Sequence, residues 1–62
     1  MDWKEIGLKI KTAREKKKLT QVQLAEKIGV SNVFISQLES GAKRASADNL
    51  AKLSKILNVK FF

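Results

Sequence analysis

Apolar residues recur at helical spacing along the whole chain. In the first segment Ile6, Ile10 and Ala13 stand three and four positions apart, with Trp3 one turn earlier, so these side chains share one face of a helix. The same spacing unites three later groups of apolar residues, which are Leu24, Ala25 and Ile28, then Ile35 and Leu38, then Leu50, Leu53, Ile56 and Leu57. The absence of proline and the scarcity of alternating β-branched residues argue against a sheet. The pattern predicts an all-α fold.

Polar residues mark the ends of the first helix. Asp2 can accept hydrogen bonds from free backbone amides, and the carboxylates of Asp2 and Glu5 favour the positive end of a helix. Lysines suit the negative end, so we expect this helix to run to about Lys16 or Lys17.

The next two helices follow each other closely. Thr20 and Gln23 have the spacing of a capping box, which predicts the start of the second helix. Gly29 can adopt the positive φ common after a helix, and Ser31, a strong N-cap residue, follows two positions later. Helices joined by so short a turn must cross at a steep angle, which predicts a helix-turn-helix over about residues 20–40.

The remaining chain completes a small bundle. The third helix is expected over about residues 32–40, ending at Gly41, and Ser46 is expected to cap a last helix that ends at Asn58. Val59 is expected to fold back onto the core. Sixty-two residues leave room for one domain, so we expect a compact bundle of four to five short helices spanning residues 1–62.

Charge points to the class of partner. Thirteen Lys and Arg against six Asp and Glu give a net charge of +7, which attracts polyanions. Nucleic acid is the leading candidate, ahead of an anionic membrane surface or an acidic protein. The sequence has no apolar run of about 20 residues that could span a membrane, and the lack of cysteine fits a reducing compartment. We expect a cytoplasmic protein.

One side of the third helix is composed unusually. It carries Asn32, Val33, Ser36 and Gln37, with no lysine or glutamate before Glu39. Surface helices normally carry charged side chains, so this side is interpreted as kept for hydrogen bonding.

Two segments of the chain carry a family resemblance. LTQVQLAEKIGVS at 19–31 and ISQLESG at 35–41 resemble the phage repressor and Cro type of helix-turn-helix domain. The similarity extends upstream to Gly7, Ile10 and Arg14 and downstream to the last helix, and so covers nearly the whole chain. The resemblance implies a lambda-repressor-like fold and a prokaryotic or phage-encoded protein.

The resemblance implies that the third helix enters the major groove of double-stranded DNA. Its expected base contacts are Asn32, Val33, Ser36 and Gln37. Asn and Gln match the donor and acceptor of adenine, Val33 can pack on a thymine methyl, and Ser36 discriminates weakly.

The resemblance also implies contacts to the DNA backbone. Gln21 is expected to meet a phosphate while bracing the third helix, and Ser31 lies at the start of that helix. Lys43 and Arg44 belong to the loop that faces the sugar-phosphate backbone, although Arg44 could instead reach into the minor groove. Ala45 stands where the family often has proline, so we expect a more flexible loop.

Two further positions concern the fold. Arg14 and Glu39 are implied as an ion pair that anchors the third helix to the first. Phe34 departs from the small polar residue usual in the family, and its side chain is expected either against the DNA or against the second helix.

These assignments predict a sequence-specific DNA-binding transcriptional regulator, most simply a repressor. It is expected to be a monomer in dilute solution and a homodimer on a palindromic operator. Neither histidine nor cysteine is present, so no catalysis, metal or other cofactor is expected. The alternative is an antitoxin-like module that binds a protein partner, favoured by the apolar residues Val33, Phe34, Phe61 and Phe62, the last two having no evident place in the core.

Overall fold

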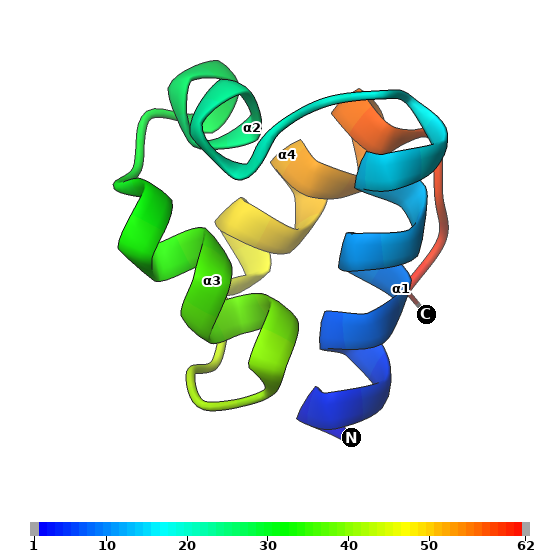
Figure 1. The fold of residues 1–62 in the computed structure, drawn as a ribbon. Helices are drawn as coiled ribbons and strands as arrows, with labels where there is room; N and C mark the ends of the chain where they lie inside the picture. Colours follow the sequence, from blue (N-terminus) through cyan, green and yellow to red (C-terminus); the bar gives the residue numbers. More distant parts are fainter. Residues whose placement is uncertain (1, 62) are drawn as a thin grey trace.

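The computed structural model describes residues 2–61, which form four helices and no strand. The helices are α1 (Trp3–Lys16), α2 (Gln21–Ile28), α3 (Asn32–Ser40) and α4 (Ala47–Leu57). α3 packs against both α1 and α2, and α4 contacts α1 and α2 behind them (Figure 1). The predicted all-α bundle is confirmed, with four helices over the described residues. None of these helices has both the length and the apolar character needed to cross a lipid bilayer.

Each helix begins at a side chain that accepts hydrogen bonds from first-turn amides. Thr20 Oγ1 accepts from the Gln23 amide at 3.0 Å, and Gln23 Oε1 accepts from the Thr20 amide at 2.8 Å, forming the predicted reciprocal box. Asp2, Ser31 and Ser46 take the capping role at the other three helix starts. These caps satisfy amides that have no partner within the helix, and they explain why the predicted starts are correct.

Each helix is followed by a residue with positive φ. These residues are Lys18 at 58°, Gly29 at 75°, Gly41 at 82° and Asn58 at 54°. After α1, the amide of Leu19 donates to the Arg14 carbonyl at 3.1 Å, so the chain reverses direction while a carbonyl of the last helical turn gains a hydrogen-bond partner. The sequence predicted this conformation at Gly29 and Asn58 but not at Lys18, because lysine has no special preference for it.

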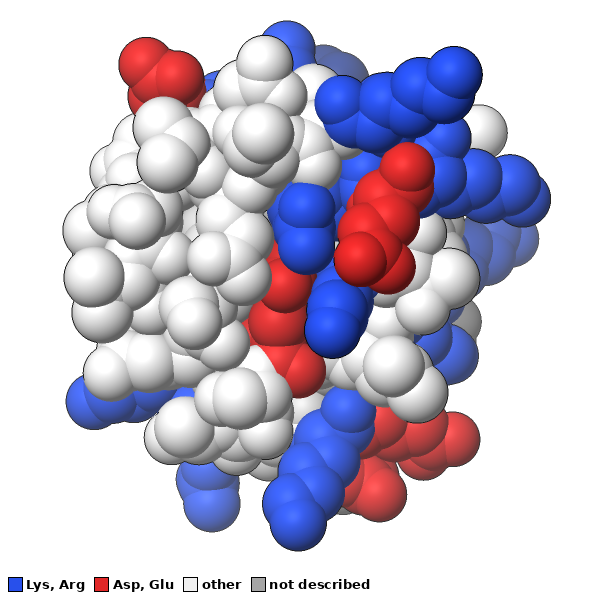
Figure 2. All heavy atoms as spheres, in the orientation of Figure 1, with Lys and Arg blue, Asp and Glu red and all other residues white. Residues whose placement is uncertain are grey.

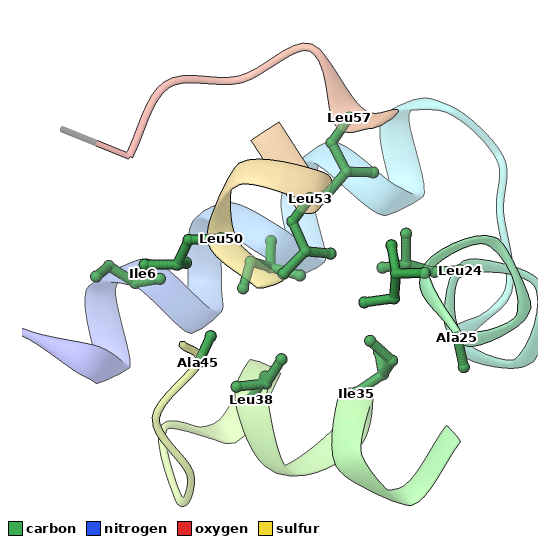
Figure 3. Packing of buried hydrophobic residues seen from close by; sticks show 11 residues of the cluster. Ile6, Leu24, Ala25, Ile35, Leu38, Ala45, Leu50, Leu53 and Leu57 are labelled. Atoms are coloured by element: carbon green, nitrogen blue, oxygen red, sulfur yellow. The ribbon is translucent and has the colours of Figure 1, made fainter. Parts of the chain in front are cut away.

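The core lies where the four apolar stripes meet (Figure 3). Its most deeply buried side chains come from all four helices and are Ile10, Leu24, Ile35, Leu38 and Leu53. The predicted stripes are therefore confirmed as the core, with Ala13, Ile56 and Trp3 half-buried at its edge.

Several side chains outside the helices also pack on the core. Ala45 is 8% exposed and lies near Leu38 and Leu50 (Figure 3), so the end of the loop before α4 packs on the core. Val59 folds back onto the core as predicted. Phe61 packs there too, which corrects the expectation that it has no place in it, whereas Phe62 lies outside the described residues.

The reason for the placement of Phe61 is the reversal after α4. Asn58 is left-handed, and the Val59 amide donates to the Ser54 carbonyl at 3.1 Å. The chain therefore turns back along the bundle instead of continuing away from it.

Candidate nucleic-acid interface

The exposed side of α3 is an uncharged, hydrogen-bonding surface. Asn32, Val33 and Ser36 are exposed and Gln37 is half-buried. At about 100° per residue the four lie within an arc of roughly 140° around the helix. In Figure 2 the side of the molecule that carries α2 and α3 is largely free of charged side chains, whereas Lys and Arg gather toward α1. The structure therefore brings these four residues together on one face.

Val33 is the apolar exception on this surface. It is 59% exposed, although burial of a valine is favourable. Its neighbour Phe34 is half-buried and packs against the core cluster. The exposed apolar surface on α3 is thus smaller than the sequence suggested.

The loop after α3 is tied to that helix through one carbonyl. The Gln37 carbonyl accepts from the Ala42 amide at 2.9 Å and the Lys43 amide at 3.3 Å, and from Ser40 Oγ at 3.0 Å. The side chains of Lys43 and Arg44 remain exposed. The two cations therefore stand on a loop held at the C-terminal end of α3.

Gln21 and Ser31 occupy the first turns of α2 and α3. Gln21 Nε2 donates to Glu39 Oε1 at 3.0 Å, so this half-buried side chain connects the start of α2 to the end of α3. Ser31 Oγ accepts from the Phe34 amide at 3.1 Å and remains exposed. Sequence reasoning did not identify Glu39 as the partner of Gln21, because no local pattern relates positions 18 residues apart.

Arg14 and Glu39 join α1 to α3 beneath the exposed surface. Arg14 Nε donates to Glu39 Oε2 at 2.6 Å and Nη2 donates to Oε1 at 3.3 Å. Arg14 Nη1 also donates to the Leu19 carbonyl at 2.7 Å. The side chains are only 11% and 4% exposed. Hydrogen bonding to Glu39 raises the pKa of the Arg14 guanidinium above its ordinary value, so the cation is favoured in the folded protein.

The close approach of α1 and α3 also depends on Gly7. A Cβ atom at this position would lie 2.6 Å from the Glu39 carbonyl oxygen, well inside van der Waals contact. Gly7 is itself buried. The orientation of α3 is therefore fixed by a glycine contact and a two-point ion pair to the same helix.

Comparison with known proteins places this arrangement in a family. A family model described as helix-turn-helix matches residues 10–62. The uncharacterized HTH-type transcriptional regulator MT0491 of Mycobacterium tuberculosis is 44% identical over 53 residues, which are 86% of this chain and 38% of that protein. Repressor protein C2 of Salmonella phage P22 is 40% identical over 57 residues, 92% of this chain and 26% of the repressor. The chain thus spans well under half the length of these relatives.

A solved structure agrees with the sequence relatives. The clp gene regulator ClgR from C. glutamicum superposes with a TM-score of 0.90 at 30% identity, covering 98% of this chain and 78% of that one. This chain has four helices, with a short turn between α2 and α3, and its sequence matches the family model. It is therefore a member of the helix-turn-helix family of transcriptional regulators.

Proposed function

We propose that the chain is a sequence-specific double-stranded DNA-binding regulator, acting as a repressor, that inserts α3 into the major groove. One observation carries this proposal: α3 exposes an uncharged hydrogen-bonding surface next to two exposed cations, Lys43 and Arg44. A major groove about 12 Å wide admits a helix. The phage repressor among the relatives favours repression as the outcome.

The side chains of α3 suit base edges. Asn32 and Gln37 each offer an amide donor and acceptor that match adenine, and Ser36 can bond to several bases. Val33, which is 59% exposed in the free protein, would pack on a thymine methyl and so be covered in the complex.

The surrounding polar groups suit phosphates. Lys43 and Arg44 would contact the sugar-phosphate backbone and set the register of α3 without reading sequence. At the start of α2, one side-chain amide proton of Gln21 is used by Glu39, and the Gln23 backbone amide is used by the Thr20 cap. The second side-chain proton of Gln21 and the backbone amides of Gln21 and Val22 would therefore meet a phosphate. Ser31 would contribute similarly at the start of α3.

Assembly would accompany binding. We infer a monomer in dilute solution that pairs on a palindromic operator, with the two α3 helices about 34 Å apart in successive major grooves. Sedimentation would detect a dimer only with operator DNA present, and a stable dimer of the free protein at micromolar concentration would contradict the inference. Bacterial and phage relatives support the cytoplasm as the site of action.

The test is selection from a random duplex library followed by affinity measurement across a salt series. We expect a palindromic sequence to be enriched and its affinity to fall steeply as salt rises, because phosphate contacts release counterions. Salt-sensitive binding without enrichment would contradict sequence-specific readout. A lack of binding even at low salt would overturn the proposal and favour a protein-binding role instead.

The protein-interaction alternative loses much of its apolar surface in the folded chain. Of the residues that favoured it, Phe34 and Phe61 pack against the core and Phe62 lies outside the described residues. Val33 alone remains well exposed on α3, and one valine is a small anchor for a protein interface.

A further inference from the structure

A groove lies between α1 and the segment that follows α4. Its volume is about 760 Å³, within the range of roughly 300–1,000 Å³ found for pockets that bury a ligand. Figure 1 shows the segment after α4 running back beside α1. One side of the groove is lined by residues between Glu5 and Lys17, and the other side by residues 57–60, which are far from them in sequence.

The floor of the groove is apolar. It is formed by Leu8 and Ala13 of α1 together with Leu57 and Val59. Leu8 is 61% exposed, slightly more than Val33 at 59%. An exposed leucine beside other apolar groups gains from being covered by an apolar partner.

The rim of the groove is positively charged. Lys9, Lys16, Lys17 and Lys60 line it, against one acidic residue, Glu5. All four lysines are exposed, and within residues 2–61 none of them pairs with an acidic side chain. The groove therefore combines an apolar floor with cations that have no acidic partner in the described chain.

The groove faces away from the proposed DNA-binding surface. On α1, Gly7 and Arg14 are directed toward α3. At about 100° per residue, the groove residues Lys9, Thr12 and Lys16 lie roughly 140–180° around the helix from those two, and Leu8 lies roughly 100–120° away. An occupant of the groove would leave α3 accessible.

We propose that this groove docks an acidic amphipathic helix from a partner protein. An apolar ridge with residues at helical spacing would lie over Leu8 and Val59, and flanking Asp or Glu side chains would meet the lysines, as in recognition of a helix by a groove. A second copy of this chain is disfavoured because a two-fold contact would bring the two lysine rims together. Nucleic acid would neutralise the lysines but would leave the apolar floor uncovered.

The test uses a displayed library of helical peptides about 15 residues long, selected against the whole 62-residue chain. We expect the enriched peptides to carry apolar residues three and four apart with acidic neighbours, and to perturb the NMR signals of Leu8 and Val59. Enrichment of peptides without acidic residues, perturbation confined to other surfaces, or no enrichment would overturn the proposal.

Substitutions then separate the floor, the rim and general charge. Leu8→Ser should weaken the selected peptide about tenfold, as loss of a central apolar anchor does, without unfolding the domain, because Leu8 is exposed. Lys9→Glu and Lys16→Glu should each weaken it more than Lys11→Glu, which makes the same charge change on α1 outside the groove. Equal losses for all three lysine variants would mean non-specific attraction and would overturn the proposal.

Two further measurements distinguish other occupants and the DNA-binding function. Sedimentation that showed self-association of the free chain, abolished by Leu8→Ser, would assign the groove to a second copy and overturn the acidic partner. Leu8→Ser should leave affinity for selected duplexes within about twofold of the original chain, since the change does not alter charge. Loss of DNA binding with Leu8→Ser would contradict the separation of the two surfaces.

Discussion

Glu39 holds Arg14 through both of its carboxylate oxygens, at 2.6 and 3.3 Å, and thereby ties the last turn of α3 to α1. The same carboxylate accepts a bond from Gln21 at the start of α2. Three helices thus meet at one acidic side chain that is 4% exposed. The orientation of α3, the helix proposed to read DNA, therefore depends on a largely buried contact.

Replacing Glu39 with alanine should destabilise the domain. The change leaves the largely buried Arg14 without its anionic partner and removes the acceptor of Gln21, which should lower the free energy of unfolding by about 3 kcal/mol. A domain of this size has a total stability of only about 3–9 kcal/mol, so Tm should fall by about 10 °C or more. Thermal melting followed by circular dichroism measures the change.

The matched control is the exposed pair of Lys52 and Asp48. Its side chains are 50% and 80% exposed and their charged atoms lie 3.4 Å apart, so Lys52→Ala should change stability by less than about 1 kcal/mol. An unchanged Tm for Glu39→Ala would contradict the anchoring role.

Gly7→Ala should separate α1 from α3. The new Cβ would meet backbone oxygens of Leu38 and Glu39, which move only if the helices move. We expect a loss of about 3 kcal/mol, as for overpacking of a tight core, measured by urea unfolding. Gly29→Ala is the control for adding a methyl group: it meets no atom within 4 Å, but φ is 75° there, so its cost should be only about 1 kcal/mol. Equal losses for both variants would argue against a close helix contact at Gly7.

Lys18→Gly should stabilise the domain. Lys18 adopts a φ of 58°, a conformation that costs an ordinary side chain about 1 kcal/mol, whereas glycine adopts it freely. After the entropy that glycine adds to the unfolded chain, the net gain should be about 0.5 kcal/mol in the free energy of unfolding. Lys17→Gly removes the same charge at a φ of −87° and should give no gain. A gain of similar size in both variants would assign the effect to lost charge repulsion.

The fold was largely predictable because its signals are local. Thr20 with Gln23 and Ser31 each fix a helix start within four residues, and Gly29 fixes the turn between them. Lys18, just after α1, adopts the same left-handed conformation as Gly29, but lysine has no preference for it that could have been recognised in the sequence. The packing of Phe61 on the core could not be predicted, because it depends on the reversal at Asn58 and on the shape of the core, both of which are set by tertiary packing.

For the candidate site, the residues on the surface of α3 were easier to predict than the hydrogen bonds that hold this helix in place. The uncharged run around Ser36 is visible in the sequence because it interrupts a charged chain. The Gln21–Glu39 bond joins positions 18 residues apart, which leave no local pattern, so it appears only when α2 and α3 are packed. The bond from Arg14 to the Leu19 carbonyl spans five residues and accompanies the reversal at Lys18, which the sequence did not predict. The groove around Leu8 was also missed, because it forms only when the segment after α4 returns to α1.

Two single variants, Gln37→Ala and Lys43→Ala, should distinguish the reading of bases from contact with phosphates. Gln37→Ala should cost about 1–3 kcal/mol on a selected duplex and relax preference at one base position, while its backbone carbonyl continues to hold the loop. Lys43→Ala should weaken all duplexes similarly and reduce the slope of log affinity against log salt by about 1, because one phosphate contact is lost. Binding isotherms on the selected duplex and a scrambled one, at several salt concentrations, measure both effects. If Gln37→Ala weakened the two duplexes equally, the α3 surface would serve only to hold the DNA backbone, and sequence readout by this helix would be refuted.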